Sequence, residues 1–229
     1  MTPLLVSCVI PVFNGERYLT EALDSITAQS HKAVEIIVVD DGSTDRTAEI
    51  ARRHPAGVRY FVQDNAGPAT ARNLGIREAR GACIAFLDAD DRWPPEKLDR
   101  QLRVLHERPG TGAVVGHATM FRDDGNTTDS GGRPTDVPIP AYITGSLLAT
   151  RETFDRVGLF ETALSHADDT AWFLRARALG VDIVLLPDVL LHRRLHGSNM
   201  SQARRGESFD EYLRLIKATL DQRRRSGSL

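Results

Sequence analysis

The chain has 229 residues and a formal net charge of −2, and 41% of its residues are hydrophobic. These values are ordinary for one globular domain, and the near-neutral charge argues against a nucleic-acid-binding protein, which would carry a strongly basic domain. No apolar stretch reaches the roughly 18 residues of a membrane span, and no secretory leader is evident, so we expect a cytoplasmic protein. Cys8 and Cys83 lie inside apolar runs and are expected to be buried core residues, not a disulfide framework.

Short apolar runs alternate with segments of helical spacing in the first half of the chain. Strands are predicted at 4–12, 34–39, 58–62 and 83–87. Helices are predicted around 19–26, over 44–53, from 68 to the glycine at 81, and from Pro94–Pro95 onward. This alternation predicts an α/β protein with a Rossmann-like, mostly parallel central sheet and helices on both faces. Ligands of such a sheet bind at the carboxyl ends of its strands, and polar clusters occur there at 14–15, 40–45 and 88–91.

The second half is less regular. Strands are predicted at 113–121 and 181–186, and helices at 170–179 and 207–225. The segment 122–140 is rich in Gly, Asp, Thr and Pro and is expected to be a long surface loop. The helix at 207–225 is amphipathic and ends in three arginines, so we expect it to pack on the domain. A contact with the inner face of the membrane or with a partner is the alternative.

Two acidic clusters directly follow apolar strands. In 88–91, carboxylates two residues apart can face one divalent cation and the phosphates that it bridges, and Mg²⁺ and Mn²⁺ favour such oxygen ligands. At Asp40 and Asp41 a carboxylate can accept hydrogen bonds from a nucleotide base or a ribose hydroxyl. Helix capping accounts for 43–45 but not for the two acids before them.

Four motifs occur in order, namely SCVIPVFN at 7–14, DDGSTD at 40–45, NLG at 73–75 and FLDADD at 86–91. Together they resemble the nucleotide-binding half of an inverting family 2 glycosyltransferase with the GT-A fold. The resemblance implies a single GT-A domain in which 1–110 bind a nucleotide sugar and 111–205 form the acceptor-binding, catalytic half, followed by a C-terminal helix and basic tail at 206–229. It also implies transfer of a sugar from a nucleoside diphosphate sugar, with uridine diphosphate favoured, and Mn²⁺ or Mg²⁺ as cofactor.

The resemblance assigns roles to individual residues. The donor nucleotide sugar would be bound by Pro11, Phe13, Asn14, Asp40, Asp41, Arg72, Asp88 and Ala89. The metal would be held by Asp90, with Asp88 and His196 as further candidate ligands. Asp169 would deprotonate the acceptor as general base. The sugar and acceptor side would comprise Trp93, Gly145, Ser146, Asp168 and Arg193.

Several of these residues also have purely structural explanations. Trp93 could be a core aromatic, His196 a polar loop residue, and the 145–146 pair a turn. The acids at 168–169 also suit the N-terminus of a helix, whose dipole favours negative charge. The acceptor is left open between a glycan, a lipid-linked sugar, a small molecule and a peptide side chain.

Other functions are weighed against the glycosyltransferase. A sugar-1-phosphate nucleotidyltransferase would need a glycine-rich basic loop after the first strand, and none follows Pro11. An aspartyl phosphatase would need Thr or Val where Arg92 stands, and a dinucleotide-binding domain would need G-x-G-x-x-G. A non-catalytic module that binds a sugar nucleotide or carbohydrate would keep the nucleotide pocket but need no base at Asp169.

Overall fold

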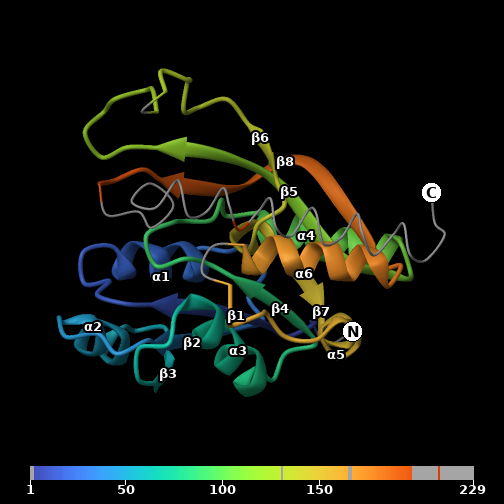
Figure 1. Cartoon of the computed structure of the whole chain (residues 1–229), viewed down its shortest axis with the longest axis horizontal. Coiled ribbons are helices and arrows are strands. Elements are labelled where there is room, and N and C mark those ends of the chain that lie inside the picture. The colour runs from blue at the N-terminus through green and yellow to red at the C-terminus, as the bar shows by residue number, and fades with distance from the viewer. Residues whose placement is uncertain (1–2, 130, 165–166, 198–210, 212–229) are drawn as a thin grey trace.

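A computed structural model describes residues 3–129, 131–164, 167–197 and 211 (Figure 1). The first half alternates strands and helices in the order β1 (Val6–Val12), α1 (Leu19–Thr27), β2 (Val34–Asp40), α2 (Thr47–Arg53), β3 (Arg59–Val62), α3 (Pro68–Glu78), β4 (Cys83–Phe86) and α4 (Lys97–Glu107). The second half comprises β5 (Thr111–Phe121), β6 (Ile139–Ala141), the 3₁₀ turn η1 (Thr144–Ser146), β7 (Leu148–Thr150), α5 (Arg151–Val157), α6 (Asp168–Ala178) and β8 (Asp182–Arg194).

The strands form one mixed sheet in the order β3-β2-β1-β4-β7-β5-β6, and β8 pairs with β5. β1 to β4 are mutually parallel, β7 is antiparallel to both of its neighbours, and β8 is parallel to β5. One set of core residues joins the sheet to α1, α2 and α4, and a second joins it to α3, α5 and α6. The predicted α/β fold, with a mostly parallel sheet and helices on both faces, is therefore confirmed.

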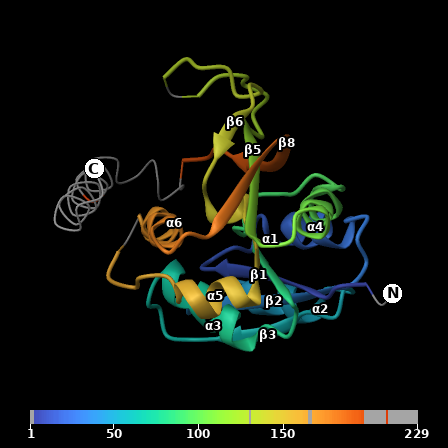
Figure 2. The ribbon, with the colours of Figure 1, turned by 90° about the vertical axis from the view of Figure 1, so that its right-hand side faces the viewer.

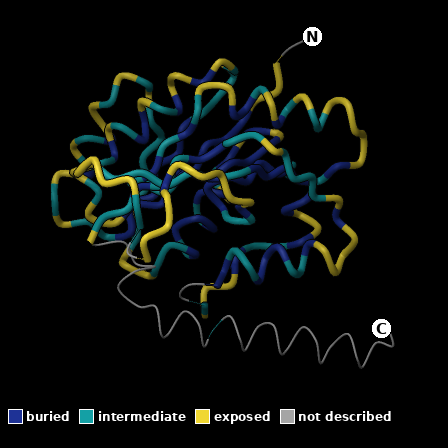
Figure 3. Tube along the Cα trace, turned by 90° about the horizontal axis from the view of Figure 1, so that it is seen from above, coloured by how far each residue is buried: buried dark blue, intermediate teal, exposed yellow. Residues whose placement is uncertain are grey.

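Strand β1 lies at the centre of the fold and is buried along its whole length, as the dark interior of Figure 3 illustrates. Cys8 and Ile10 belong to the core on the α1 side, whereas Val9 packs on the α3 side. Burial on both faces explains why the strand reads as an unbroken apolar run. Helix α3 approaches closely because Gly75 has no side chain, and a Cβ there would lie 2.3 Å from Val9 Cγ1. Both cysteines are buried, as predicted.

The second half departs from the expected elements. β8 continues to Arg194, well past the predicted end at 186, because it runs beside β5 through Arg194 despite three irregularities in register. The segment 192–194, which lies beyond the predicted strand, is therefore also strand. β6, β7 and α5 were not predicted, whereas the turn weighed for 145–146 is present as η1. The expected loop at 122–140 projects from the body of the protein in Figure 2, and its last residues form β6.

The predicted helix at 207–225 lies outside the described residues, apart from Glu211. Among the helices that the structure describes, none has the length and apolar character that crossing a membrane requires.

Candidate functional site

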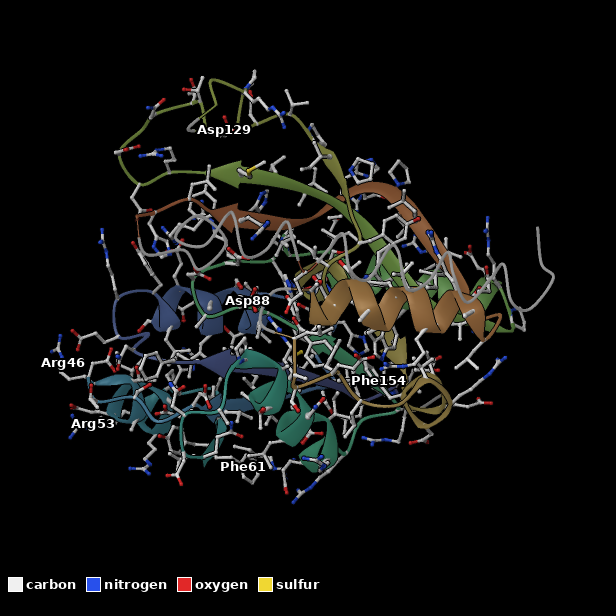
Figure 4. The ribbon with its side chains drawn as sticks, viewed as in Figure 1. Arg46, Arg53, Phe61, Asp88, Asp129 and Phe154 are labelled. Atoms are coloured by element: carbon white, nitrogen blue, oxygen red, sulfur yellow. The ribbon has the colours of Figure 1, made fainter. Side chains whose placement is uncertain are left out.

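The carboxyl ends of β1, β2 and β4 meet at one edge of the sheet. The parallel register places Val12 beside Asp40, and Val9 beside Phe86, which lies two residues before Asp88. The polar clusters at 14–15, 40–45 and 88–91 therefore share an edge, as expected for the ligand site of such a sheet. In Figure 4 Asp88 lies at the middle of the molecule, far from the tip of the long loop marked by Asp129.

Asp41 organises the loop that follows β3. Its buried carboxylate accepts hydrogen bonds from Gln63 Nε2 at 2.7 Å and from the backbone N–H groups of Ala66 and Gly67, both at 2.8 Å. An ionised carboxylate offers about four acceptor positions, and described residues occupy three of them. Phe13 follows the end of β1 on the same edge and is 53% exposed.

Asp40 is also buried and accepts from Tyr60 Oη at 2.6 Å and from the backbone N–H of Ser43 at 2.7 Å. Asn14 has φ 51° and is bonded to the same loop, because its N–H donates to Ser43 Oγ and its Oδ1 accepts from the Thr44 N–H. Neither Ser43 nor Thr44 caps α2, so the expectation that these two residues cap a helix is wrong. The two loops satisfy each other's polar groups, and Asp45 accepts from the Thr47 N–H at 2.9 Å instead.

The other donor-side positions are less open. Pro11 is buried within β1, where it pairs in register with Val39 of β2. Ala89 lies in the loop after β4. A Cβ added to Gly15 would lie 3.6 Å from the Cβ of Ala89. Both residues shape the edge through backbone and packing.

Arg72 connects the donor edge to α6. Its buried guanidinium donates from Nη2 to Asp88 Oδ1 and from Nη1 to Asp168 Oδ2, each at 2.9 Å. Burial lowers the pKa of Arg72, but the two carboxylates outweigh that effect and raise it above its ordinary value. Its Nε is buried and has no hydrogen-bond partner within the described part of the chain. Arg72 and Asp168 lie 96 positions apart in the sequence and were predicted for the donor side and the acceptor side. The Arg72 side chain thus joins the two sides.

Asp169 lies beside this bridge in the first turn of α6. Burial and then the neighbouring charge of Asp168 raise its pKa to about 6, although Arg72 acts in the opposite direction. The Thr170 N–H donates to its Oδ1 at 2.6 Å. An acid that only complements a helix dipole would be stabilised in its charged form, so the raised pKa fits a proton acceptor working near neutral pH better.

The candidate metal ligands Asp90 and His196 are in contact, with Oδ2 and Nε2 2.9 Å apart. The two side chains are close enough that they would be able to hold one cation together. Within the described ranges, no group of three or more His, Cys, Asp or Glu side chains could hold a metal alone. Mg²⁺ and Mn²⁺ often bind through one or two carboxylates and substrate phosphates, and this donor set fits that arrangement.

Arg194 reaches this acidic loop and was not predicted as a site residue. Its backbone N–H donates to Asp91 Oδ1 and its Nε to the Asp90 carbonyl, both at 2.9 Å. Arg193, the residue assigned from the sequence, pairs in register with Met120 of β5. The sequence offers two adjacent arginines, and only the alternation of side chains along β8, which extends beyond the predicted strand, distinguishes them.

The remaining acceptor-side residues form a buried cluster. Trp93 is 3% exposed and donates from Nε1 to the carbonyl of Gly145 at 2.9 Å. Gln101 Nε2 donates to the Ser146 carbonyl at 2.8 Å, and Lys97 Nζ to the Leu147 carbonyl at 3.4 Å. Three side chains from one segment therefore hold three successive carbonyls of one turn. This placement fits the structural explanations weighed for Trp93 and the 145–146 pair.

Lys97 gives stability a pH dependence whose sign follows from its burial, which lowers its pKa from 10.5 to about 7. Between these values the unfolded chain binds the proton and the folded chain does not, so the free energy of unfolding rises with pH. Relative to Lys97→Met, the wild type is expected to gain about 5 kcal/mol between roughly pH 6 and pH 10.5 in urea unfolding. The exposed Lys32→Met is the control, and a difference independent of pH would contradict the prediction.

A separate cavity of about 370 Å³ lies between α1 and α2. It is lined by Thr20, Arg46, Glu49, Ile50, Arg53, His54 and Pro55. Figure 4 shows Arg46 and Arg53 well away from Asp88. None of the candidate catalytic or metal-binding side chains lines this cavity, so it is distinct from the edge described above.

Comparisons with known proteins place these features in a family. A relative from Rickettsia typhi described as an uncharacterized glycosyltransferase is 33% identical over 208 residues, or 84% of this chain and 64% of the relative. The putative teichuronic acid biosynthesis glycosyltransferase TuaG of Bacillus subtilis is 36% identical over 123 residues, covering 52% of this chain and 49% of TuaG. The chain thus spans less than two thirds of either relative.

Solved structures share the fold. S. aureus TarS 1-349 in complex with UDP-GlcNAc superposes with a TM-score of 0.74 at 21% identity, covering 94% of this chain and 66% of that one. Mannosyltransferase PcManGT from Pyrobaculum calidifontis, in complex with GDP-Man and Mn²⁺, gives 0.69 at 25% identity, covering 89% and 61%. The family model for "Glycosyl transferase family 2" matches residues 7–179. This match spans the donor edge, the Arg72 bridge and α6, and it confirms the resemblance seen in the sequence motifs: the chain belongs to glycosyl transferase family 2.

Proposed function

We propose that this chain is a metal-dependent inverting glycosyltransferase that moves a sugar from a nucleoside diphosphate sugar to an acceptor nucleophile. The observation that carries the proposal is the Arg72 bridge. Its two hydrogen bonds bring Asp88, at the donor edge, and Asp168, next to the candidate base, to the two terminal nitrogens of one guanidinium. A donor bound at the sheet edge and a base on α6 would then share one site.

The donor side is built for a nucleotide. The exposed ring of Phe13 offers a stacking surface for the base, and Asp41, held by three hydrogen bonds, can accept one more from it. The relatives bound to UDP-GlcNAc and to GDP-Man support a nucleoside diphosphate sugar as the donor class. Uridine diphosphate is the first choice, and guanosine diphosphate the second.

Asp90 and His196 would hold Mn²⁺ or Mg²⁺ together with the diphosphate, and Asp88 precedes Asp90 by two residues in the same loop. The cation would neutralise the negative charge that develops on the leaving diphosphate. The Mn²⁺ in the mannosyltransferase complex supports this choice of cofactor.

Asp169 would complete the reaction from the acceptor side. Its carboxylate takes the proton of an acceptor hydroxyl, and the acceptor oxygen attacks the anomeric carbon as the bond from that carbon to the diphosphate breaks. Attack from the face opposite the leaving group inverts the anomeric configuration. The products are the glycosylated acceptor, the nucleoside diphosphate and the proton on Asp169, which is then lost to water.

The test is a screen of nucleotide sugars for release of nucleoside diphosphate, with Mn²⁺ and with chelator. Wild type is expected to release it from at least one donor only when the cation is present. Asp90→Asn should lower kcat/KM at least about 100-fold, the scale expected when a group stabilising developing charge is removed. The exposed Asp24→Asn is the matched control.

Failure of every donor to release nucleoside diphosphate would contradict the proposal. If that inactive wild type still bound a nucleotide sugar, the non-catalytic binding module would be the better interpretation.

A further inference from the structure

Arg194 ends β8 at the acidic loop after β4 and is 4% exposed. Its Nε donates to the carbonyl oxygen of Asp90, and its backbone N–H donates to the carboxylate of Asp91, each at 2.9 Å. One residue therefore fixes both the main chain of the candidate metal ligand and the buried acid that follows it.

The rest of the guanidinium is also held. Nη1 donates to Asp123 and Nη2 to Glu21, so the group joins the start of the long loop and α1 to the acidic loop. Its Cζ lies 4.5 Å from the ring centroids of both Tyr18 and Phe121. The planar guanidinium makes these contacts in several directions at once, and the compact ammonium group of lysine cannot reproduce them.

The main chain reinforces this connection. Arg92 and His192 exchange two backbone hydrogen bonds of 3.1 and 2.9 Å, which tie the acidic loop to the end of β8. His196 follows Arg194 by two residues, and its ring approaches both the Asp90 carboxylate, at 2.9 Å, and the Tyr18 ring, at 5.0 Å. The position of His196 against Asp90 therefore depends on how the end of β8 is anchored.

We propose that Arg194 is a positioning residue for the divalent cation, acting through the main chain of Asp90 and through the placement of His196. This inference rests on the proposed function, since it assumes that the pair binds a cation. Groups that orient metal ligands change metal affinity when they are removed, typically by 10–100-fold. A residue that served only general packing would not affect cation binding selectively.

The test measures binding of Mn²⁺ to the whole chain by calorimetry and by the electron paramagnetic resonance signal of free Mn²⁺, with UDP or GDP at saturation. Arg194→Lys is the main variant, because it keeps the charge and most of the buried stem, and Arg194→Met removes every side-chain hydrogen bond. Arg92→Lys is the matched control, since Arg92 pairs with the same Glu21 and lies over the same Phe121 ring but donates no side-chain bond to Asp90.

For Arg194→Lys we expect Mn²⁺ affinity to fall about 10–100-fold. Affinity for the nucleotide without metal should stay within about threefold of wild type, and Arg92→Lys should resemble wild type in both measurements. The thermal midpoint of each variant without metal or nucleotide reports whether the fold is retained.

Unchanged Mn²⁺ affinity in Arg194→Lys would overturn the inference while leaving the proposed function in place. An equal loss of nucleotide affinity without metal would also overturn it, because the effect would then be a general loosening of the site. If wild type bound no Mn²⁺ with either nucleotide, both this inference and the metal-dependent function would fail.

Discussion

Replacing Asp169 by Asn is expected to lower kcat by about 10³-fold or more while donor affinity stays close to that of wild type. The amide cannot accept the acceptor's proton, and general base catalysis contributes about 10²–10⁴-fold. In the described part of the chain no hydrogen bond or ion pair joins Asp169 to Asp90 or His196, so donor and cation binding should survive. Steady-state kinetics with the donor found by the screen, together with calorimetric titration of the same donor, would measure both effects.

The same substitution has a pH signature. The pKa of Asp169 is about 6, raised by burial, and the base works only when deprotonated. The value of kcat/KM for wild type should therefore fall as the pH decreases through about 6. Because the folded chain holds the proton more tightly than the unfolded chain between pH 3.8 and about 6, stability declines with rising pH across that window. At neutral pH the uncharged Asn is then expected to stabilise the fold by about 1–3 kcal/mol.

Asp155→Asn, an exposed change on α5, is the matched control and should alter neither kinetics nor stability. If Asp169→Asn kept full acceptor-dependent turnover, Asp169 would not be the general base. If kcat/KM of the wild type fell at low pH with a midpoint at the ordinary aspartate pKa, the argument from burial would be contradicted.

Replacing Arg72 by Met is expected to lower the free energy of unfolding by about 3–5 kcal/mol. The substitution leaves two carboxylates, Asp88 and the buried Asp168, without their shared cation, and a buried charge that loses its partner is costly. Arg72 also lowers the pKa of Asp169, so its removal should move the acidic limb of the residual activity to higher pH. Urea unfolding and the pH profile of kcat/KM measure the two effects.

Arg77→Met is the control for Arg72→Met, because Arg77 lies on the same helix, α3, but is exposed. Equal stability of the two variants would show that the bridge contributes nothing to the fold. An unchanged acidic limb would show that Arg72 does not act on Asp169.

The strands of the first half could be predicted from sequence because burial on both faces leaves an unbroken apolar run. β1 and β4 are buried throughout, so apolar residues stand at every position regardless of which face they meet. The polar residues that follow such strands are confined to one edge by the parallel arrangement. The shared location of the 40–45 and 88–91 clusters therefore follows from topology alone.

The second half could not be predicted in the same way because its strands depend on partners distant in sequence. β8 is only partly buried and contains Pro187 and Asp188, so its composition does not indicate a strand of 13 residues. Pairing with β5 provides the backbone hydrogen bonds that carry it to Arg194. β6 and β7 have three residues each, too few for a periodic signal.

The candidate site shows the same division. Asp88 and Asp90 were predicted from the motif at 86–91, and Asp169 was predicted from the family resemblance. The bridge through Arg72 to Asp168 and the reach of Arg194 to Asp90 are contacts between residues 96 and 104 positions apart, and no local pattern specifies them. For Trp93, the sequence allowed a place on the sugar and acceptor side or a place in the core, and only its buried hydrogen bond to Gly145 shows where the indole lies.

A structure of the chain bound to a nucleoside diphosphate and Mn²⁺ tests the central claim most directly. With UDP or GDP in separate crystals, we predict the base between Phe13 and Asp41, and Mn²⁺ about 2.1 Å from a carboxylate oxygen of Asp90, bridging the diphosphate. A nucleotide bound elsewhere, for example in the cavity between α1 and α2 beside Arg46, would contradict the account. A diphosphate at the predicted edge with no cation on Asp90 would contradict its metal-dependent part.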